Sequence, residues 1–325
     1  GTPINPSAFN TTEFQANFGL ASIGALTAYD NSGTGQGITV AVIDTGIDVS
    51  NPEFAGAIAA ASTNTVTNIV ADLQDVDGHG TAVASVIGAR KNDALTHGVA
   101  FDSTILAIRA DDAPGSRFTP GSVATAINYA VANNADIINL SIGGPAPLTA
   151  GYQTALQGAV NAGVIIVTAA GNEGGEAATE VLFPARLSNC STLIICDALT
   201  ATNGFNSQGR MIAVGSTNQD NSLSIFSNPA GDTASAYLVA PGNGIVMTGV
   251  GGGVVTGLGT SFAAPHVSGA LAILLERFPT LTTENAVALL LTTATDLGAT
   301  GTDTTFGRGL LNLQAAFQAQ GVSVN

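Results

Sequence analysis

An aspartate, a histidine and a serine lie in three short stretches whose composition suits nucleophilic chemistry. Asp44 ends the apolar run ITVAVID, His79 stands between two glycines in DGHGT, and Ser261 lies among small residues in GLGTSFAAPHVSG. A serine hydroxyl is a weak nucleophile, so it needs a base that takes its proton and an acceptor that holds this base. Small neighbours leave room for the main chain of a substrate. The three stretches therefore predict a catalytic triad.

The other histidines have a plainer interpretation. His266 lies five residues after Ser261 in the same predicted helix and so points to another face, and His97 has no nearby partner in the sequence. We expect both to be packed or capping residues, which leaves His79 as the base. Taken alone, Asp44 could equally be a turn residue at the end of a strand.

The elements that must position these residues alternate along the chain. The expected strands are 38–44, 104–110, 136–142, 164–170 and 211–217, and the expected helices are 79–90, 122–134, 151–163, 261–277 and 283–293. Continuously apolar strands separated by helices predict an α/β fold with a parallel sheet covered on both faces. Functional side chains collect at the carboxyl ends of such strands, where Asp44, segment 141–144 and Asn172 lie.

The chain is strongly acidic. Its 325 residues include 8 Lys and Arg against 23 Asp and Glu, a formal net charge of −15. This charge excludes the basic surface that binds nucleic acid and disfavours anionic membrane surfaces. Residues 234–275 contain no Asp, Glu, Lys or Arg, but Pro241, Pro265 and several glycines argue against a membrane-spanning helix. No basic and apolar leader opens the chain, so we expect a mature protein that is secreted or lies at the cell surface.

Five motifs, in order along the chain, resemble those of the subtilisin-like serine proteases, or subtilases. They are VAVIDTGID at 40–48, DGHGTAVASVIGA at 77–89, NLSIGGP at 139–145, AAGNEGG at 169–175 and GTSFAAPHVSG at 259–269. The order Asp, His, Ser is that of subtilisin. The resemblance implies a three-layer α/β/α fold with a mainly parallel sheet, and endopeptidase activity on protein or peptide substrates. We expect one catalytic domain over 1–325, with an amino-terminal extension at 1–30 and a cysteine-containing insertion at 187–210.

The resemblance also implies residue roles. Ser261 attacks the scissile carbonyl, His79 carries the proton to the leaving amine, and Asp44 holds the imidazole. Asn172 matches the oxyanion-hole amide, and the backbone N–H of Ser261 at a helix start is the second donor. Pro265 is expected in the first turn of that helix, where its missing N–H costs little.

Substrate-binding residues follow from the same resemblance. An extended peptide would add as a strand between a floor segment and an outer segment, APGSR at 113–117. The residues are Ser141, Ile142, Gly143 and Gly144 in the floor, Pro114 and Gly115 in the outer segment, and Ala170 and Gly171 before Asn172. Leu182 falls where the family often has a small residue at the base of the pocket for the substrate residue before the scissile bond. We expect a shortened pocket that prefers mid-sized apolar residues, although Glu173 at its rim could instead favour Lys or Arg.

Two further features are open to two interpretations each. Glu53 and Asn92 match calcium-ligand positions of the family, but Lys91 in the same loop argues against a divalent cation and no third ligand near the amino terminus is evident. The alternative is an ordinary surface loop. Cys190 and Cys196 are close enough in sequence to predict a small disulfide, and two free buried thiols are the alternative.

The segments EFQANFGLASIGALTAYDNSGTGQG and HGVAFDSTILAIRAD resemble the passenger domains of autotransporter subtilases. This resemblance implies a carboxy-terminal membrane β-barrel in the precursor, and we expect the present chain to be a monomer. A catalytically silent binding or adhesive passenger is the alternative function. A dinucleotide-binding oxidoreductase is disfavoured because GTGQG at 33–37 precedes a strand and lacks GxGxxG spacing.

Overall fold

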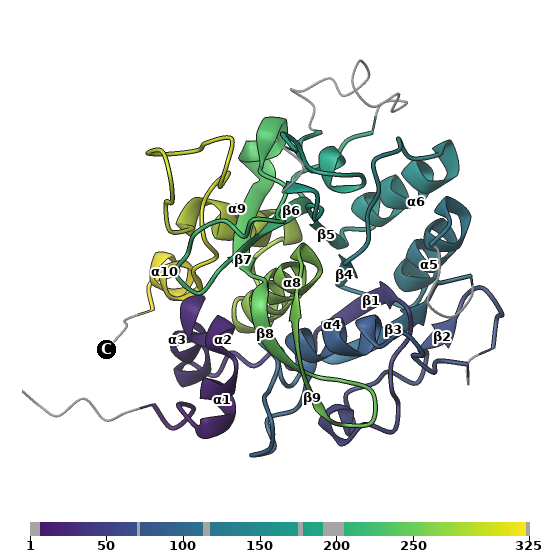
Figure 1. Cartoon of the computed structure of the whole chain (residues 1–325), viewed down its shortest axis with the longest axis horizontal. Coiled ribbons are helices and arrows are strands. Elements are labelled where there is room, and N and C mark those ends of the chain that lie inside the picture. The colour runs from purple at the N-terminus through teal and green to yellow at the C-terminus, as the bar shows by residue number, and fades with distance from the viewer. Residues whose placement is uncertain (1–6, 70–71, 113–117, 175–177, 191–204, 323–325) are drawn as a thin grey trace, which may run out of the picture.

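A sheet of seven strands forms the centre of the molecule (Figure 1). The computed structural model describes residues 7–69, 72–112, 118–174, 178–190 and 205–322. The strand order is β2-β3-β1-β4-β5-β6-β7, and every pairing is parallel. The bounds are Thr39–Asp44 for β1, Thr63–Asn64 for β2, Thr104–Arg109 for β3, Ile137–Leu140 for β4, Ile165–Ala169 for β5, Met211–Thr217 for β6 and Tyr237–Pro241 for β7.

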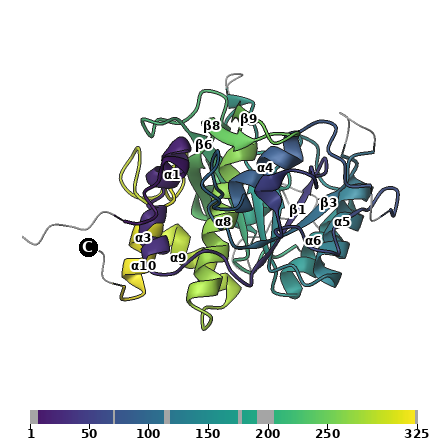
Figure 2. The same cartoon turned by 90° about the horizontal axis from the view of Figure 1, so that it is seen from below.

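Helices cover both faces of this sheet (Figure 2). Helices α4 (His79–Gly88) and α8 (Thr260–Arg277) lie on one face, with α9 (Thr283–Thr293) behind α8. Helices α5 (Pro120–Ala132) and α6 (Ala150–Asn161) cover the other face. The predicted three-layer α/β/α fold with a parallel central sheet is confirmed.

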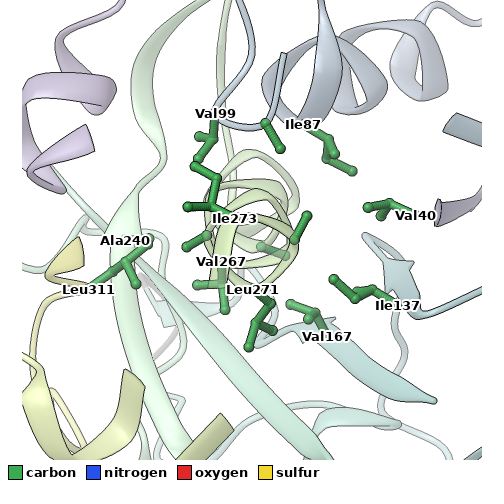
Figure 3. Close-up of a cluster of buried hydrophobic side chains, with 14 of the residues drawn as sticks. Val40, Ile87, Val99, Ile137, Val167, Ala240, Val267, Leu271, Ile273 and Leu311 are labelled. Atoms are coloured by element: carbon green, nitrogen blue, oxygen red, sulfur yellow. The ribbon is translucent and has the colours of Figure 1, made fainter. Parts of the chain in front are cut away.

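Alternating side chains of each strand enter two separate cores, as expected when both faces of a parallel sheet are covered. Val40 and Val42 of β1 belong to the core around α8, whereas Ala41 and Ile43 belong to the core under α5 and α6. Figure 3 shows the first core, in which side chains from several strands surround α8. Helix α8 is therefore enclosed by the protein along most of its length.

Several elements lie outside the predicted set. Short helices α1 (Thr12–Ala16), α2 (Phe18–Ser22) and α3 (Ala25–Asp30) follow one another, and α3 packs beside α10 (Leu313–Ala319). Strands β8 (Asn243–Thr248) and β9 (Val254–Leu258) form an antiparallel hairpin that leads into α8. Phe14, Leu20 and Tyr29 belong to the same buried core as α8. The segment expected as an extension thus contributes to the main core, while the proposed domain division stays a prediction.

Two predictions concern single segments. Cys190 is buried at the end of a short 3-10 helix, Ala185–Asn189, and Cys196 lies outside the described residues, so the disulfide stays a prediction. Within the described ranges, none of the helices combines the length and the apolar character needed to cross a bilayer.

Candidate active site

Asp44 and His79 meet at the carboxyl edge of the sheet. Asp44 is the last residue of β1 and is 1% exposed, and His79 is the first residue of α4. The His79 Nδ1 atom lies 2.7 Å from Asp44 Oδ1, which also accepts a hydrogen bond of 2.8 Å from the backbone N–H of Thr45. Gly78 before the helix has φ of 94°, a left-handed conformation that glycine adopts without strain. This turn brings His79 over the end of β1.

The negative charges around His79 raise the pKa of its imidazole. Burial lowers the pKa of the imidazole, but the carboxylate of Asp44 and its hydrogen bond outweigh this effect. The negative charges of Asp77 and Asp75 act in the same direction, and together these groups raise the pKa to about 9. The histidine side chain is still 27% exposed, so its outer edge faces the solvent and can meet a substrate.

Ser261 stands at the start of α8, directly after the β8–β9 hairpin. Its hydroxyl donates a hydrogen bond of 3.0 Å to the carbonyl oxygen of Ser141. Ser261 and His79 line the same cavity, so the nucleophile and the base of the predicted triad face a common space. Asp44 lies behind His79, and the structure thus brings the three predicted residues together.

Pro265 lies one turn further into α8 than predicted. The helix begins at Thr260, which makes Pro265 an interior residue. A proline at this position cannot donate to the carbonyl oxygen four residues earlier, that of Ser261. The hydroxyl of Ser141 donates to this oxygen instead, at 2.7 Å. The prediction of a first-turn proline was wrong, and the missing helical bond is replaced by a bond to the end of β4.

The same serine is part of a longer buried chain of hydrogen bonds between β4 and α8. Asn139 Nδ2 donates to Ser141 Oγ at 2.9 Å, and Ser268 Oγ donates to Asn139 Oδ1 at 2.8 Å. Asn139 and Ser268 are completely buried. We call Asn139, Ser141, Ser261 and Ser268 the strand–helix relay.

The side chain of Asn172 is oriented by Thr260, the residue before Ser261. Its Oδ1 atom accepts hydrogen bonds from the backbone N–H and the hydroxyl of Thr260, at 2.8 and 3.0 Å. Because both donors occupy the oxygen, the amide Nδ2 points to the other side, near the turn at Gly259. Asn172 lines the same cavity as Ser261, so an N–H donor is available in the space that the Ser261 side chain faces.

The cavity has a volume of about 640 Å³ and runs from the triad to an apolar end between α5 and α6. Its lining residues are Thr45, Asp77, His79, Phe118, Thr119, Pro120, Val123, Ser141, Ile142, Gly143, Gly144, Pro145, Ala146, Pro147, Leu148, Tyr152, Asn172, Phe183, Pro184 and Ser261. The complete predicted floor, Ser141 to Gly144, is part of this lining. Pro114 and Gly115 lie outside the described residues.

Leu182 lies between two predicted substrate-binding segments, the floor and the pair Ala170 and Gly171. Its backbone N–H donates to the carbonyl oxygen of Ala170 at 2.8 Å. A Cβ atom added to Gly171 would lie 2.7 Å from Leu182 Cγ, and one added to Gly143 would lie 3.7 Å from Leu182 Cβ. Ala170, Gly171 and Leu182 are not among the cavity-lining residues. The Leu182 side chain thus lies beside Gly143 and Gly171, behind the residues that line the cavity.

The predicted calcium ligands Glu53 and Asn92 lie close together, and Glu13 lies beside them. Asn92 Nδ2 is 3.4 Å from Glu53 Oε1, and Glu13 accepts hydrogen bonds from the backbone N–H groups of Asn92 and Asp93, at 3.0 and 3.1 Å. Lys91, expected to disfavour a cation, pairs with Asp93 at 3.4 Å. Counting only His, Cys, Asp and Glu side chains, the described part of the chain contains no group of three placed to hold a metal.

Three neighbours of these residues were missed in the sequence. Thr260 orients Asn172, Asp75 contacts the segments around both Asp44 and His79, and Glu13 lies beside the Glu53–Asn92 pair. Only Asp75 could have been found from the local sequence. It lies three residues before Gly78, the capping position of α4, which has no side chain to cap the helix. His97 and His266 are buried, as predicted.

Comparisons with known proteins identify the family of the chain. A family model described as the Subtilase family matches residues 35–309. Subtilisin of Bacillus pumilus is 35% identical over 302 residues, covering 93% of this chain and 98% of that protein. Subtilisin E of Bacillus subtilis (strain 168) is 34% identical over 302 residues, covering 93% and 71%, and Subtilisin Savinase of Lederbergia lenta is 33% identical over 301 residues, covering 92% and 97%. The chain therefore belongs to the subtilase family and is a serine endopeptidase of the subtilase type.

Proposed function

We propose that Ser261, His79 and Asp44 are the nucleophile, the general base and the residue that orients the base, and that Asn172 is an oxyanion donor. The single observation that carries this proposal is the 2.7 Å contact between His79 and Asp44 on the cavity that Ser261 and Asn172 also line. Labelling with a serine-directed covalent inhibitor tests it. One adduct, located by mass spectrometry on the peptide that contains Ser261, is expected together with complete loss of peptide hydrolysis.

The proposed reaction begins with a change of partner for the Ser261 hydroxyl. In the resting structure this hydroxyl donates to Ser141 O, so it must turn toward Nε2 of His79 before it can give up its proton. The oxygen then bonds to the scissile carbonyl carbon, and the carbonyl oxygen takes up the negative charge. The amide of Asn172 and the backbone N–H of Ser261 donate to that oxygen. Asp44 stabilises the imidazolium formed in this way, and His79 then passes the proton to the leaving amine as the C–N bond breaks. Water, deprotonated by His79, next attacks the acyl group on Ser261, and the proton returns to the Ser261 oxygen as the carboxylic acid leaves.

The activity is expected to depend on pH above the usual range of histidine. Only the neutral imidazole can accept a proton, and the pKa of His79 is raised to about 9. We therefore expect kcat/KM to fall as the pH drops through about 9, rather than near the unperturbed pKa of about 6.5. A pH profile of peptide hydrolysis measures the midpoint.

A variant tests the cause of this shift. Asp77→Asn removes an exposed charge that raises the pKa of His79, so the midpoint should move to lower pH. Asp30→Asn is the matched control, because Asp30 is also exposed and accepts a hydrogen bond from Ser7, in the amino-terminal segment. A midpoint that stays fixed in both variants would contradict the electrostatic explanation.

The position of Leu182 supports a shortened pocket for the substrate residue before the scissile bond. We expect wild-type enzyme to prefer mid-sized apolar residues there, because the side chain of Leu182 takes up space between Gly143 and Gly171. The variant Leu182→Gly should accept Phe and Tyr with a gain in kcat/KM of at least roughly 10- to 200-fold, the usual worth of a single methylene group in such a pocket.

A panel of peptides that vary only in this residue measures the preference. Leu148→Ala is a suitable control, since Leu148 lines the distant apolar part of the cavity and should not change selectivity at the scissile bond. A wild-type preference for Phe or Tyr would contradict the shortened pocket. A preference for Lys or Arg would instead assign selectivity to Glu173.

We also propose that Glu53, Asn92 and Glu13 belong to a calcium site. Glu13 and Glu53 are 4% and 2% exposed, and Glu53 Oε2 is buried without a hydrogen-bond partner within the described residues. Burial raises the pKa of the Glu53 carboxyl, and the negative charge of Glu13 adds to this effect. Two neighbouring buried carboxylates are costly, Lys91 of the same loop pairs with Asp93 and not with either of them, and calcium prefers carboxylate and amide oxygens. When bound, the ion would stabilise the fold and would take no part in the chemistry.

Removal of calcium is therefore expected to lower the melting temperature. Free calcium at 100 times its Kd would add about 2.7 kcal/mol to the free energy of unfolding, and a chelator should remove this contribution. The measurement is calorimetry on the Ser261→Ala variant, which avoids self-digestion. Glu53→Gln should make the melting temperature insensitive to calcium, whereas Glu284→Gln, on the exposed side of α9, should not. A wild-type melting temperature unaffected by chelation would contradict the site.

A further inference from the structure

We propose that Asp75 is a positioning residue that fixes Asp44 and His79 relative to each other through the backbone segments that carry them. The inference rests on the roles proposed above for that pair. Asp75 is 1% exposed and lies in the loop before α4, outside the set of residues that line the cavity. Its side chain therefore acts on the triad without touching the substrate.

Both oxygens of the Asp75 carboxylate are used. Oδ1 accepts hydrogen bonds from the hydroxyl of Thr45 at 2.9 Å and from the backbone N–H of Gly78 at 2.8 Å. Oδ2 accepts from the backbone N–H and the hydroxyl of Thr81, at 2.8 and 2.6 Å. Thr45 directly follows Asp44, and Gly78 and Thr81 flank His79 in the sequence. One side chain thus joins the segments that carry the two members of the pair.

On the histidine side, Asp75 caps the helix that His79 begins. The first N–H groups of a helix have no partner within it, and the capping position of α4 is Gly78, which has no side chain to offer. The carboxylate of Asp75 accepts from the N–H groups of Gly78 and Thr81 in its place. A negative charge at this end of a helix is also favourable for the helix dipole. The direction of the first turn, and with it His79, depends on this cap.

On the aspartate side, Thr45 connects the end of β1 to the same helix. The Thr45 hydroxyl donates to Asp75 and accepts a hydrogen bond of 2.9 Å from the backbone N–H of Gly80. The two segments are in direct contact, since a Cβ atom added to Gly80 would collide with the carbonyl oxygen of Gly46 and lie 3.1 Å from Asp44 Cβ. A shift of the Asp75 carboxylate therefore moves Thr45 and the first turn of α4 together.

Asp75 also contributes a charge. Its four hydrogen-bond donors are neutral groups, and its negative charge is one of those that raise the pKa of His79. The reaction makes His79 positive, so this charge favours the protonated base. Replacing the carboxylate by an amide removes the charge and turns one acceptor into a donor that faces other donors.

The test compares Asp75→Asn with Asp136→Asn. Asp136 is a half-buried aspartate whose carboxylate accepts from the backbone N–H of Thr39, at the opposite end of β1 from Asp44. For each protein, kcat and KM are measured on one peptide, with active sites counted by a serine-directed covalent inhibitor, across a range of pH. We expect kcat per active site to fall by roughly 10- to 100-fold in Asp75→Asn, because a misplacement of about 1 Å can cost about 10²-fold.

The remaining readouts separate positioning from folding. KM should stay within about twofold, since binding groups are untouched, and the acid limit of the pH profile should move to lower pH. Asp136→Asn should change neither. A kcat per counted site equal to wild type, or an acid limit that does not move, would overturn the proposal.

A second variant covers the case in which Asp75→Asn does not fold. Thr45→Val keeps the caps of Asp75 on α4 and removes the connection to the Asp44 segment, so kcat should again fall with KM preserved. An unchanged kcat in Thr45→Val would also overturn the proposal. If wild type and Asp136→Asn were active but carried no adduct at Ser261, the roles proposed for the triad would fail instead.

Discussion

Replacing Ser261 by alanine is expected to lower kcat by about 10⁶, the size of effect known for removal of the triad serine in subtilisin. Without the hydroxyl no covalent intermediate can form at this site, and His79 has no proton to accept from the protein. The predicted substrate floor at Ser141–Gly144 is unchanged in this variant, so KM should stay close to the wild-type value. The remaining rate would come from the oxyanion donors and substrate binding.

The measurement needs long incubations with a chromogenic peptide and highly purified protein. Ser222→Ala is a matched control, since Ser222 is an exposed serine that hydrogen-bonds to Asp220 in a turn. It should be as active as wild type and should still form one adduct with the covalent inhibitor. If Ser261→Ala kept wild-type activity or still reacted with the inhibitor, another residue would be the nucleophile.

The second large effect is expected for Asn172. Asn172→Ala should lower kcat by roughly 10² to 10³, which is the known contribution of the corresponding donor in subtilisin. The amide hydrogen bond strengthens as charge develops on the substrate oxygen, so the loss should appear in kcat rather than in KM. Thr260 holds Oδ1 of Asn172, and the N–H of the amide is therefore preoriented before the substrate arrives.

Peptide hydrolysis by Asn172→Ala, with active sites counted, measures this loss. The control is Asn161→Ala, an exposed asparagine at the end of α6 that hydrogen-bonds to Gln157 and Gln208. Its kcat should equal that of wild type. A loss below about tenfold in Asn172→Ala would mean that the oxyanion is stabilised by other groups.

Much of the fold could be predicted from the sequence because its buried strands are continuously apolar. Val40 and Ile43 lie in a run that can only be a buried strand or a short buried helix segment, and flanking glycines favour the strand. The β8–β9 hairpin escaped prediction because VMTGVGGGVVTGL combines glycines with short apolar pairs and resembles a loop. The helices of residues 12–30 were missed because each has only five or six residues.

The residues proposed to react could be picked out from the sequence, whereas the residues that orient them could not. Asp44, His79, Ser261 and Asn172 are marked by residue type, glycine neighbours and motif order. The role of Thr260 depends on an asparagine 88 residues away, and Glu13 meets Asn92 across 79 residues. Such pairs arise from the packing of distant segments, which local periodicity does not describe. Pro265 was wrongly expected in the first turn of its helix for a related reason. The bond from the Ser141 hydroxyl to the carbonyl oxygen of Ser261, which replaces the helical bond that Pro265 cannot make, comes from a distant segment.

The strand–helix relay joins segment 141–144 and helix α8 into one cooperative unit. Helix α8 is attached to β4 through the carbonyl of Ser261 and the hydroxyl of Ser268, two turns apart on one face. The amide protons of α8 should therefore exchange with solvent only when the whole core opens. Heat inactivation and global unfolding should coincide, and an inhibitor lying on the floor segment should slow hydrogen exchange along a helix that it barely touches.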